Sequence, residues 1–166
     1  MKKLLTLALA LVLSLGLFAC AKQEIVYPER VTLYLPDQSA IDAGGYGFVT
    51  KEIDMHMPNL DSLKAMQLIG TLVYEGALPE GCDALSFWTY NATLDMNAAF
   101  ADALSSTGTL GETLLMGCLV NTMLTYFALD SITVTAEGGV LQTGHETYDY
   151  PLTFYGNSYF ENAGEG

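Results

Sequence analysis

The sequence is poor in basic residues. Its 166 residues include six lysines and arginines against 19 aspartates and glutamates, so the formal net charge is −13 at pH 7. So negative a surface repels phosphate backbones and anionic lipid headgroups, because like charges oppose close approach. The composition therefore argues against nucleic acid as a partner and against attachment to a membrane through the protein surface.

Motifs that would place a metal or a catalytic centre are also missing. There is no Cys-x-x-Cys, His-Glu-x-x-His or glycine-rich phosphate loop, and the only histidines are His56 and His145. No nucleophile elbow supports Ser86 or Cys82 as a partner for His145. The acidic stretch from Asp37 to Asp42 lacks the ligand spacing of an EF-hand. We therefore expect no cofactor, no metal and no catalysis.

The N-terminus has the parts of an export signal. Two lysines follow Met1, residues 4–18 are almost wholly apolar, and Ala19-Cys20 comes next. About 15 apolar residues are fewer than the roughly 20 needed to span a bilayer core, which favours a cleaved signal over a spanning helix. We expect residues 1–19 to be a signal peptide.

The stretch Leu17-Phe18-Ala19-Cys20 resembles the lipobox of bacterial lipoproteins, although Phe18 is larger than the residue usual at its position. The resemblance implies that a diacylglycerol is joined to Cys20 and that the chain is cut just before it. The protein would then be extracytoplasmic and anchored to the bacterial membrane by lipid, with residues 20–29 as a short tether. An ordinary secretory signal with an incidental cysteine is the alternative.

Two cysteines besides Cys20 belong to the expected domain. An exported protein can form a disulfide, so a bridge between Cys82 and Cys118 is chemically allowed. Cys82 lies in a turn, however, whereas Cys118 falls on an apolar face in the middle of an expected helix, where a free thiol behaves as a small hydrophobe. We expect both thiols to be unbridged and keep the disulfide as the alternative.

Alternating and helical patterns divide the rest of the chain. Strands are predicted at 31–35 and 48–55. A helix follows Pro58, with Asn59 as its cap and Gly76 as its end. We expect one face of this helix to carry its large apolar side chains: Leu60, Leu63, Met66, Ile69 and Val73.

A second set of elements follows. Strands are predicted at 85–90 and 92–96, then a short helical turn from Asn97 to Leu104. A long helix runs from Leu110 to Ala128, with Thr109 and Glu112 at capping-box spacing. One side of it should carry Leu114, Leu115, Cys118, Leu119, Thr122, Met123 and Tyr126.

The C-terminal part reads as two strands and a tail. Strands are predicted at 131–135 and, more weakly, at 141–155, where Pro151 interrupts the pattern; residues 156–166 should be a loose acidic tail. Runs of strands separated by two helices predict an α+β two-layer domain, with a small mixed sheet, two main helices and the order β-β-α-β-β-α-β-β.

This order of elements and several short stretches resemble the GerMN domain of bacterial sporulation and germination proteins and of some envelope lipoproteins. The stretches are 31–37, Leu78 to Gly81, Leu94 to Asn97, 120–125 and 132–135. The family usually reads valine-aspartate-leucine-serine at Leu94 to Asn97, so the match there is partial. The resemblance covers roughly residues 30–155 and implies a single domain, similar to the ring-building modules of envelope complexes and without enzymatic activity.

The polar residues of these stretches also have a structural interpretation. Asp95 and Asn97 stand where a strand passes into a helix, and their side-chain oxygens can accept hydrogen bonds from free backbone amides there. Asn121 and Thr122, inside the long helix, could hydrogen-bond a neighbouring loop or strand end. A buried structural role is the simpler reading for each.

A partner surface is predicted near the C-terminus. If residues 148–154 form a strand, its two-residue period places Tyr148, Tyr150, Leu152 and Phe154 on one face. Pro151 cannot donate to a sheet ladder and so marks an edge strand. The face is either a partner surface or the cover of the domain's own core.

Two functions are compatible with the sequence. The first is a non-catalytic, lipid-anchored module that binds another envelope protein or a cell-wall component. The GerMN resemblance implies sporulation or germination as the process in which it acts. The alternative is a small extracytoplasmic hydrolase or ligand-binding lipoprotein. A deep pocket with a histidine and a nucleophile would favour the alternative; a filled core with an exposed apolar surface would favour the first.

Overall fold

The computed structural model describes residues 27–157. The expected signal peptide, Cys20, most of the expected tether and residues 158–166 lie outside this range. Among the described residues, no helix is both long and apolar enough to cross a membrane. In chain order the elements are β1 (Glu29–Pro36), α2 (Gln38–Asp42), β2 (Phe48–Met55), α3 (Asp61–Tyr74), β3 (Ala84–Trp88), β4 (Thr93–Met96), α4 (Ala98–Ser106), α5 (Thr109–Phe127), β5 (Thr133–Ala136), β6 (Gly139–Gln142) and β7 (Thr147–Tyr148).

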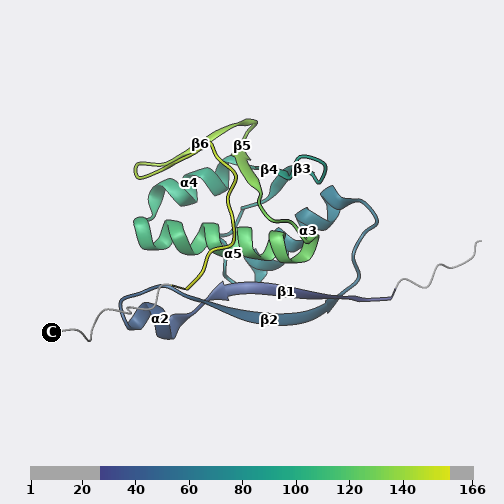
Figure 1. Cartoon of the computed structure of the whole chain (residues 1–166), viewed down its shortest axis with the longest axis horizontal. Helices are drawn as coiled ribbons and strands as arrows, with labels where there is room; N and C mark the ends of the chain where they lie inside the picture. The colour runs from purple at the N-terminus through teal and green to yellow at the C-terminus, as the bar shows by residue number, and fades with distance from the viewer. Residues whose placement is uncertain (1–26, 158–166) are drawn as a thin grey trace, which may run out of the picture.

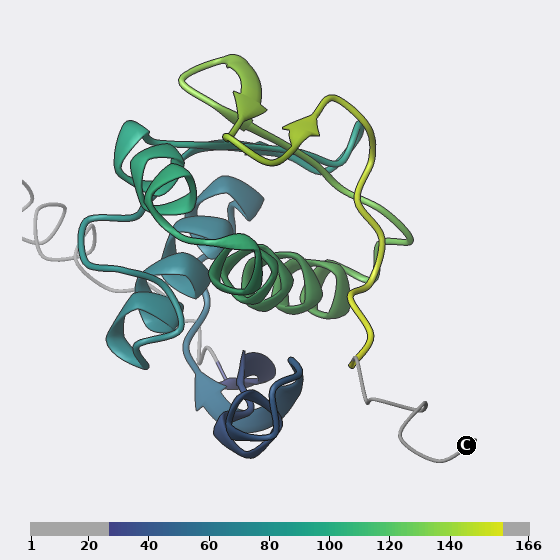
Figure 2. The same cartoon turned by 90° about the vertical axis from the view of Figure 1, so that its left-hand side faces the viewer.

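The strands form two sheets with the helices between them. The larger sheet has the order β3-β4-β5-β6-β7, with β4 and β5 parallel and the other pairs antiparallel. The smaller sheet is the antiparallel hairpin β1-β2. Figures 1 and 2 show α3, α4 and α5 lying between the larger sheet and the hairpin. The α+β class and the mixed sheet are confirmed, whereas the hairpin forms a sheet of its own.

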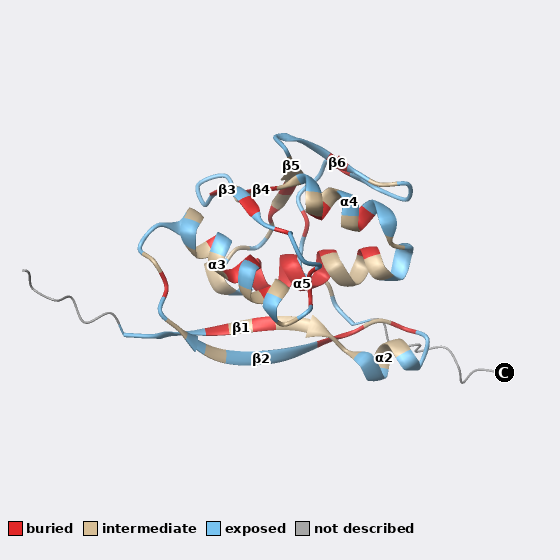
Figure 3. Ribbon diagram, turned by 180° about the vertical axis from the view of Figure 1, so that it is seen from behind, coloured by how far each residue is buried: buried red, intermediate tan, exposed pale blue. Residues whose placement is uncertain are grey.

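Helix α5 is the centre of the core. Residues 116–124 of α5 are all buried, and Figure 3 shows this part of the helix in red above the hairpin. A helix enclosed on all sides cannot have a single apolar stripe, so the expected one-sided face of α5 is wrong. Gly117 faces the ring of Phe48, where an added Cβ would overlap the ring.

Helix α3 buries a different face from the one expected. Its buried residues are Ala65, Leu68, Ile69 and Leu72, whereas Leu60, Leu63 and Met66 are exposed. The expected set advances mainly in steps of three. Each such step drifts by about 60° around a helix of about 100° per residue. Leu60 and Ile69 therefore point in opposite directions, and the expected face could not be continuous.

The helix caps agree with the sequence only in part. The side chain of Asn97 caps α4 by accepting from the backbone N–H of Phe100, as predicted. The capping box of α5 is wrong: the N-cap is Gly108, and no side chain bonds to the free amides. Likewise α3 begins after Leu60, with no side-chain cap from Asn59. The short helix α2, capped by Asp37, was not expected.

Two further expectations concern Asp95 and the thiols. Oδ1 of Asp95 accepts from the backbone N–H of Gly138 (2.9 Å) and from the hydroxyl of Thr135 (2.7 Å), so its structural role is confirmed. Cys82 and Cys118 are free and buried, so the disulfide alternative is not realised. Burial raises the pKa of the Cys118 thiol to about 12.

Candidate functional site

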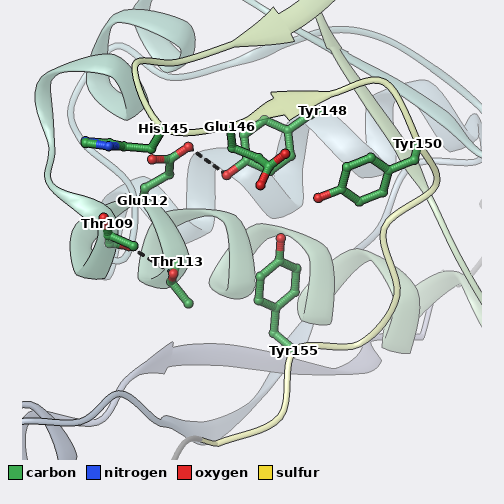
Figure 4. Close-up of a pocket in the computed structure, with 8 residues that line it drawn as sticks. All are labelled: Thr109, Glu112, Thr113, His145, Glu146, Tyr148, Tyr150 and Tyr155. Carbon is green, nitrogen blue, oxygen red and sulfur yellow. Dashed lines mark hydrogen bonds between the residues drawn. The ribbon is translucent and has the colours of Figure 1, made fainter.

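A polar cleft lies between the N-terminal turns of α5 and the C-terminal segment of the chain. It encloses about 260 Å³. Its lining residues come from α5, from the turn between β6 and β7, from β7 and from the segment after it: Thr109, Glu112, Thr113, His145, Glu146, Tyr148, Tyr150 and Tyr155. Figure 4 shows Glu112 rising from α5 toward Tyr148, while Tyr150 and Tyr155 point into the space beside them. The C-terminal segment therefore forms one wall of the cleft, and α5 forms its base.

Glu112 is the buried carboxylate of the cleft. It is only 3% exposed, although it lies in the first turn of α5. Its Oε1 accepts from the hydroxyl of Thr143 at 2.6 Å and from that of Tyr148 at 2.8 Å. Its Oε2 is also buried but has no hydrogen-bond partner among the described residues. A buried carboxylate oxygen without a donor costs free energy, so this atom is a natural contact for a bound donor.

Thr143 fixes the turn that carries His145 and Glu146. Its hydroxyl oxygen accepts hydrogen bonds from the backbone N–H groups of His145 (3.1 Å) and Glu146 (3.0 Å). The same hydroxyl donates a hydrogen bond to Oε1 of Glu112. Such side-chain bonds to backbone two or three residues on are typical of turns that begin with threonine. The turn and the base of the cleft are thus held by one hydroxyl group.

Three tyrosines form the wall of the cleft. The ring centroids of Tyr148 and Tyr150 are 6.5 Å apart. Figure 4 shows the hydroxyls of Tyr150 and Tyr155 pointing toward the middle of the cleft. Burial raises the pKa of all three phenols, and neighbouring carboxylates add to the effect: Glu112 at Tyr148, and Glu146 at Tyr150 and Tyr155. The cleft therefore disfavours additional negative charge.

Asn121 fastens the C-terminal segment to the core. Its side-chain Nδ2 donates to the carbonyl of Tyr155 at 2.9 Å, and its Oδ1 accepts from the N–H of the same residue at 2.8 Å. On the next position of α5, the hydroxyl of Thr122 accepts from the N–H of Tyr34 in β1 at 3.0 Å. The prediction that these two helix residues bond neighbouring segments is confirmed. Tyr155 thus has its backbone bound and its ring free to line the cleft.

A second hollow of about 340 Å³ adjoins the first. The two share Tyr150 and Tyr155, and the second also has Tyr46 and Phe154 in its lining. The ring of Phe154 packs edge-on against Tyr34, with centroids 5.3 Å apart. Because one segment of chain lines both hollows, they form a continuous surface of aromatic rings and backbone, which we call the C-terminal face.

The structure separates the four residues of the predicted partner surface. Tyr148 and Leu152 are buried, whereas Tyr150 is 44% exposed and Phe154 is 52% exposed. They do not share one face, because the strand expected over 141–155 is broken. It consists of β6, the two-residue strand β7 and, beyond them, a single bridge from Leu152 to Ile132. A partner role is thus a prediction for the two exposed rings, while the other two belong to the core.

Charge is distributed unevenly around this face. The lysines and arginines of the described residues are Arg30, Lys51 and Lys64, and each is within 4 Å of a carboxylate on β1, β2 or the end of α3. None of them lines either hollow. Within residues 27–157, no group of three histidine, cysteine or acidic side chains is placed to hold a metal ion.

Glu112 and Asn121 are the two α5 residues whose hydrogen bonds position the C-terminal face. Sequence reasoning assigned Glu112 to a capping box. A signal was present: Glu112 precedes Met116 and Val120 at four-residue steps, so it continues a buried row of the helix. A carboxylate in such a row indicates a buried polar contact. No comparable signal exists for Tyr155, whose position depends on a hydrogen bond across the fold.

Comparisons with known proteins give a likeness in fold. No protein-family model and no curated protein matches the chain. The tandem GerMN domains of the sporulation protein GerM from Bacillus subtilis match with a TM-score of 0.56 and 16% identity, over 76% of this chain and 46% of that one. This chain therefore spans about half the length of that structure. A protein from Clostridium perfringens assigned as a lipoprotein matches with a TM-score of 0.42 and 12% identity, over 81% of this chain and 93% of that one.

Proposed function

We propose that the protein is a non-catalytic, lipid-anchored module of the bacterial envelope whose C-terminal face binds another envelope protein or a cell-wall component. The anchor is the lipid on Cys20, and the domain begins about ten residues beyond it. The fold likeness to GerMN domains and the matching sequence stretches support sporulation or germination as the setting. The lipobox-like stretch supports the extracytoplasmic location.

The observation that carries the binding role is a pair of exposed aromatic rings on a segment whose backbone is hydrogen-bonded to the core. Tyr150 and Phe154 are exposed, yet the residues around them are held by the Asn121 clamp and by burial of Tyr148 and Leu152. Large aromatic side chains on a pre-ordered backbone bind partners at low entropic cost. Exposed aromatic rings that adjoin a hollow are typical of interaction surfaces.

The cleft supports binding better than hydrolysis. His145 lines it, but no serine or cysteine is among its lining residues, and Cys82 and Ser86 lie in other parts of the fold. The hydroxyls in the lining belong to threonines and tyrosines. Thr143 and Tyr148, whose hydroxyls are both bonded to the buried Glu112, already hold the turn and the wall of the cleft. Nucleophilic catalysis needs a nucleophile within reach of its base.

The experiment uses two variants of the full chain in the native bacterium. Cys20→Ala should move the protein out of the membrane fraction or leave it uncleaved, because the lipid alone attaches it. Phe154→Ala should leave the protein in the membrane and lower the recovery of a crosslinked partner, with Val140→Ala, exposed on β6, as the matched control. Normal membrane recovery of Cys20→Ala, cleaved and without lipid, would contradict the anchor. Unchanged partner recovery with Phe154→Ala would contradict the binding face.

A further inference from the structure

The cleft of the C-terminal face has the chemistry of a site for one cation. Oxygen atoms approach it from several elements: the carboxylates of Glu112 and Glu146 and the phenol groups of Tyr150 and Tyr155. Neither of these two hydroxyls makes a hydrogen bond to another described residue. Both can therefore accept from a bound donor. No lysine or arginine of the described residues lies in the lining, whose one basic residue is His145.

The buried oxygen of Glu112 shows where a donor is missing. Oε1 is occupied by two hydroxyl donors, whereas Oε2 is enclosed without one. Satisfied hydrogen bonding is the rule for buried polar atoms, and each exception asks for a structural reason. A bound N–H donor in the cleft would supply the partner that the fold itself does not.

We propose that the cleft binds the ammonium group of a lysine side chain presented by the partner protein. This inference rests on the proposed function, since it names the chemistry that the C-terminal face recognises. The ammonium would donate to the carboxylate of Glu146 and to a phenol oxygen of Tyr150 or Tyr155. A shift of the Glu112 side chain would bring Oε2, which is enclosed in this structure, into contact with the same group. The tyrosine rings add cation–π attraction.

Size and geometry favour a lysine over larger or differently charged ligands. About 260 Å³ is below the roughly 300–1,000 Å³ typical of pockets for whole small molecules, and it suits a single side chain. Arginine binds a carboxylate best through two parallel bonds, and Oε1 of Glu112 is already occupied. An anionic group would meet Glu112 and Glu146 with no lysine or arginine in the lining to offset them.

The adjoining hollow indicates a protein as the source of the ammonium. A partner segment with a lysine in the cleft would extend over Tyr150 toward Phe154 and Tyr46, where an apolar residue next to the lysine can pack. Charge then assists encounter, because the strongly acidic domain attracts a basic partner. Aromatic contact in the second hollow supplies affinity.

The test measures the binding of short peptides to the purified full chain in detergent by saturation-transfer NMR. The probe is Ac-Gly-Gly-Lys-Gly-Gly-NH₂, and its neutral control replaces lysine by acetyl-lysine. We expect the lysine peptide to bind at least about tenfold more tightly, because only it carries the charge. Raising NaCl from about 50 mM to about 500 mM should weaken its binding by screening.

Substitutions in the cleft test whether the peptide binds there. Glu146→Gln should weaken binding of the lysine peptide several-fold, whereas Glu80→Gln, the same change on an exposed turn outside the cleft, should leave it unchanged. Tyr150→Leu should also weaken it. These two cleft residues are exposed, so both variants should fold, and a thermal melt checks this.

Three results would overturn the assignment. They are equal binding of the acetyl-lysine peptide, tighter binding of the corresponding arginine peptide, and no saturation transfer at about 10 mM lysine peptide, a concentration at which even millimolar affinity is visible. If the peptide fails while Phe154 still controls partner capture, the lysine assignment is wrong and the proposed function stands. If the peptide binds at the cleft but no partner is captured, the site is real and the proposed function fails.

Discussion

Replacing Asn121 by leucine should release the C-terminal face from the core. Leucine has a similar branched shape, so the change removes the amide without opening a large cavity. Both hydrogen bonds to Tyr155 are lost, which leaves its N–H and C=O without partners at a partly buried position. Each unsatisfied group costs about 1–3 kcal/mol. Partial access to water reduces this, so the free energy of unfolding should fall by about 2–4 kcal/mol.

Thr122→Val is the matched control from the adjacent position of α5. It keeps the side-chain shape and removes one acceptor, the one that binds the N–H of Tyr34. Its cost should be about 1–2 kcal/mol, because one backbone group and not two loses its partner. Thr122 contacts the hairpin and Asn121 the C-terminal segment, so the two variants should loosen different parts of the molecule.

The assay combines urea unfolding with amide hydrogen exchange. Unfolding curves give the two free energies. Exchange shows where protection is lost: at Tyr155 in Asn121→Leu, and at Tyr34 in Thr122→Val. The reasoning is refuted if Asn121→Leu costs less than Thr122→Val, or if the amide of Tyr155 keeps its full protection in the leucine variant.

Three smaller predictions follow from burial and backbone geometry. Tyr148→Ala should lower stability by about 3–5 kcal/mol, as for other buried aromatics, while Tyr150→Ala should leave the melting temperature nearly unchanged; similar losses in both would show that Tyr150 is a core residue. Ala128 ends α5 with φ +52°, a conformation that favours glycine, so Ala128→Gly should raise the free energy of unfolding by about 1 kcal/mol; a lower midpoint in urea would argue against strain there. The pKa of Cys118 is raised to about 12 from 9.0, so the thiol ionises first in the unfolded chain, and stability should fall as the pH rises from 9 toward 12. Cys118→Ala should make the free energy of unfolding depend less steeply on pH. An unchanged dependence would show that the tyrosines, and not Cys118, cause the loss of stability.

Local patterns predicted most elements of the fold. β2 begins and ends at the predicted residues, because the segment 48–55 is bounded by glycines before it and a proline after it. Asn97 was correctly read as a cap, since its side chain acts on amides of the same short segment. Information of this kind is contained in neighbouring residues, so it can be read from one sequence.

Burial on particular helix faces could not be read in the same way. α3 has apolar residues on more than one side, and only the position of the sheet decides that Leu68 and Leu72 are buried while Leu60 and Leu63 are exposed. The core position of α5 depends likewise on the hairpin β1-β2, which packs on the side away from the larger sheet. Periodicity describes one helix at a time and contains no information about its neighbours.

The candidate site was predicted in part for a related reason. The sequence drew attention to Tyr150 and Phe154 through their spacing, and both are exposed on the C-terminal face. The buried residues that shape this face, Glu112 and Asn121, lie 36 and 34 residues before the tyrosines that they contact. Their contacts arise only when the segment after β7 folds back over α5.

The central claim is that the C-terminal face meets a partner in the envelope. Site-specific photo-crosslinking in intact cells tests it most directly, with a photoreactive residue placed at position 154 or, as a control, at position 140 on β6. Both native residues are exposed, at 52% and 59%. The account predicts one defined crosslinked product in the membrane fraction from position 154, and none from position 140. The same product from both positions, or from position 140 alone, would contradict it.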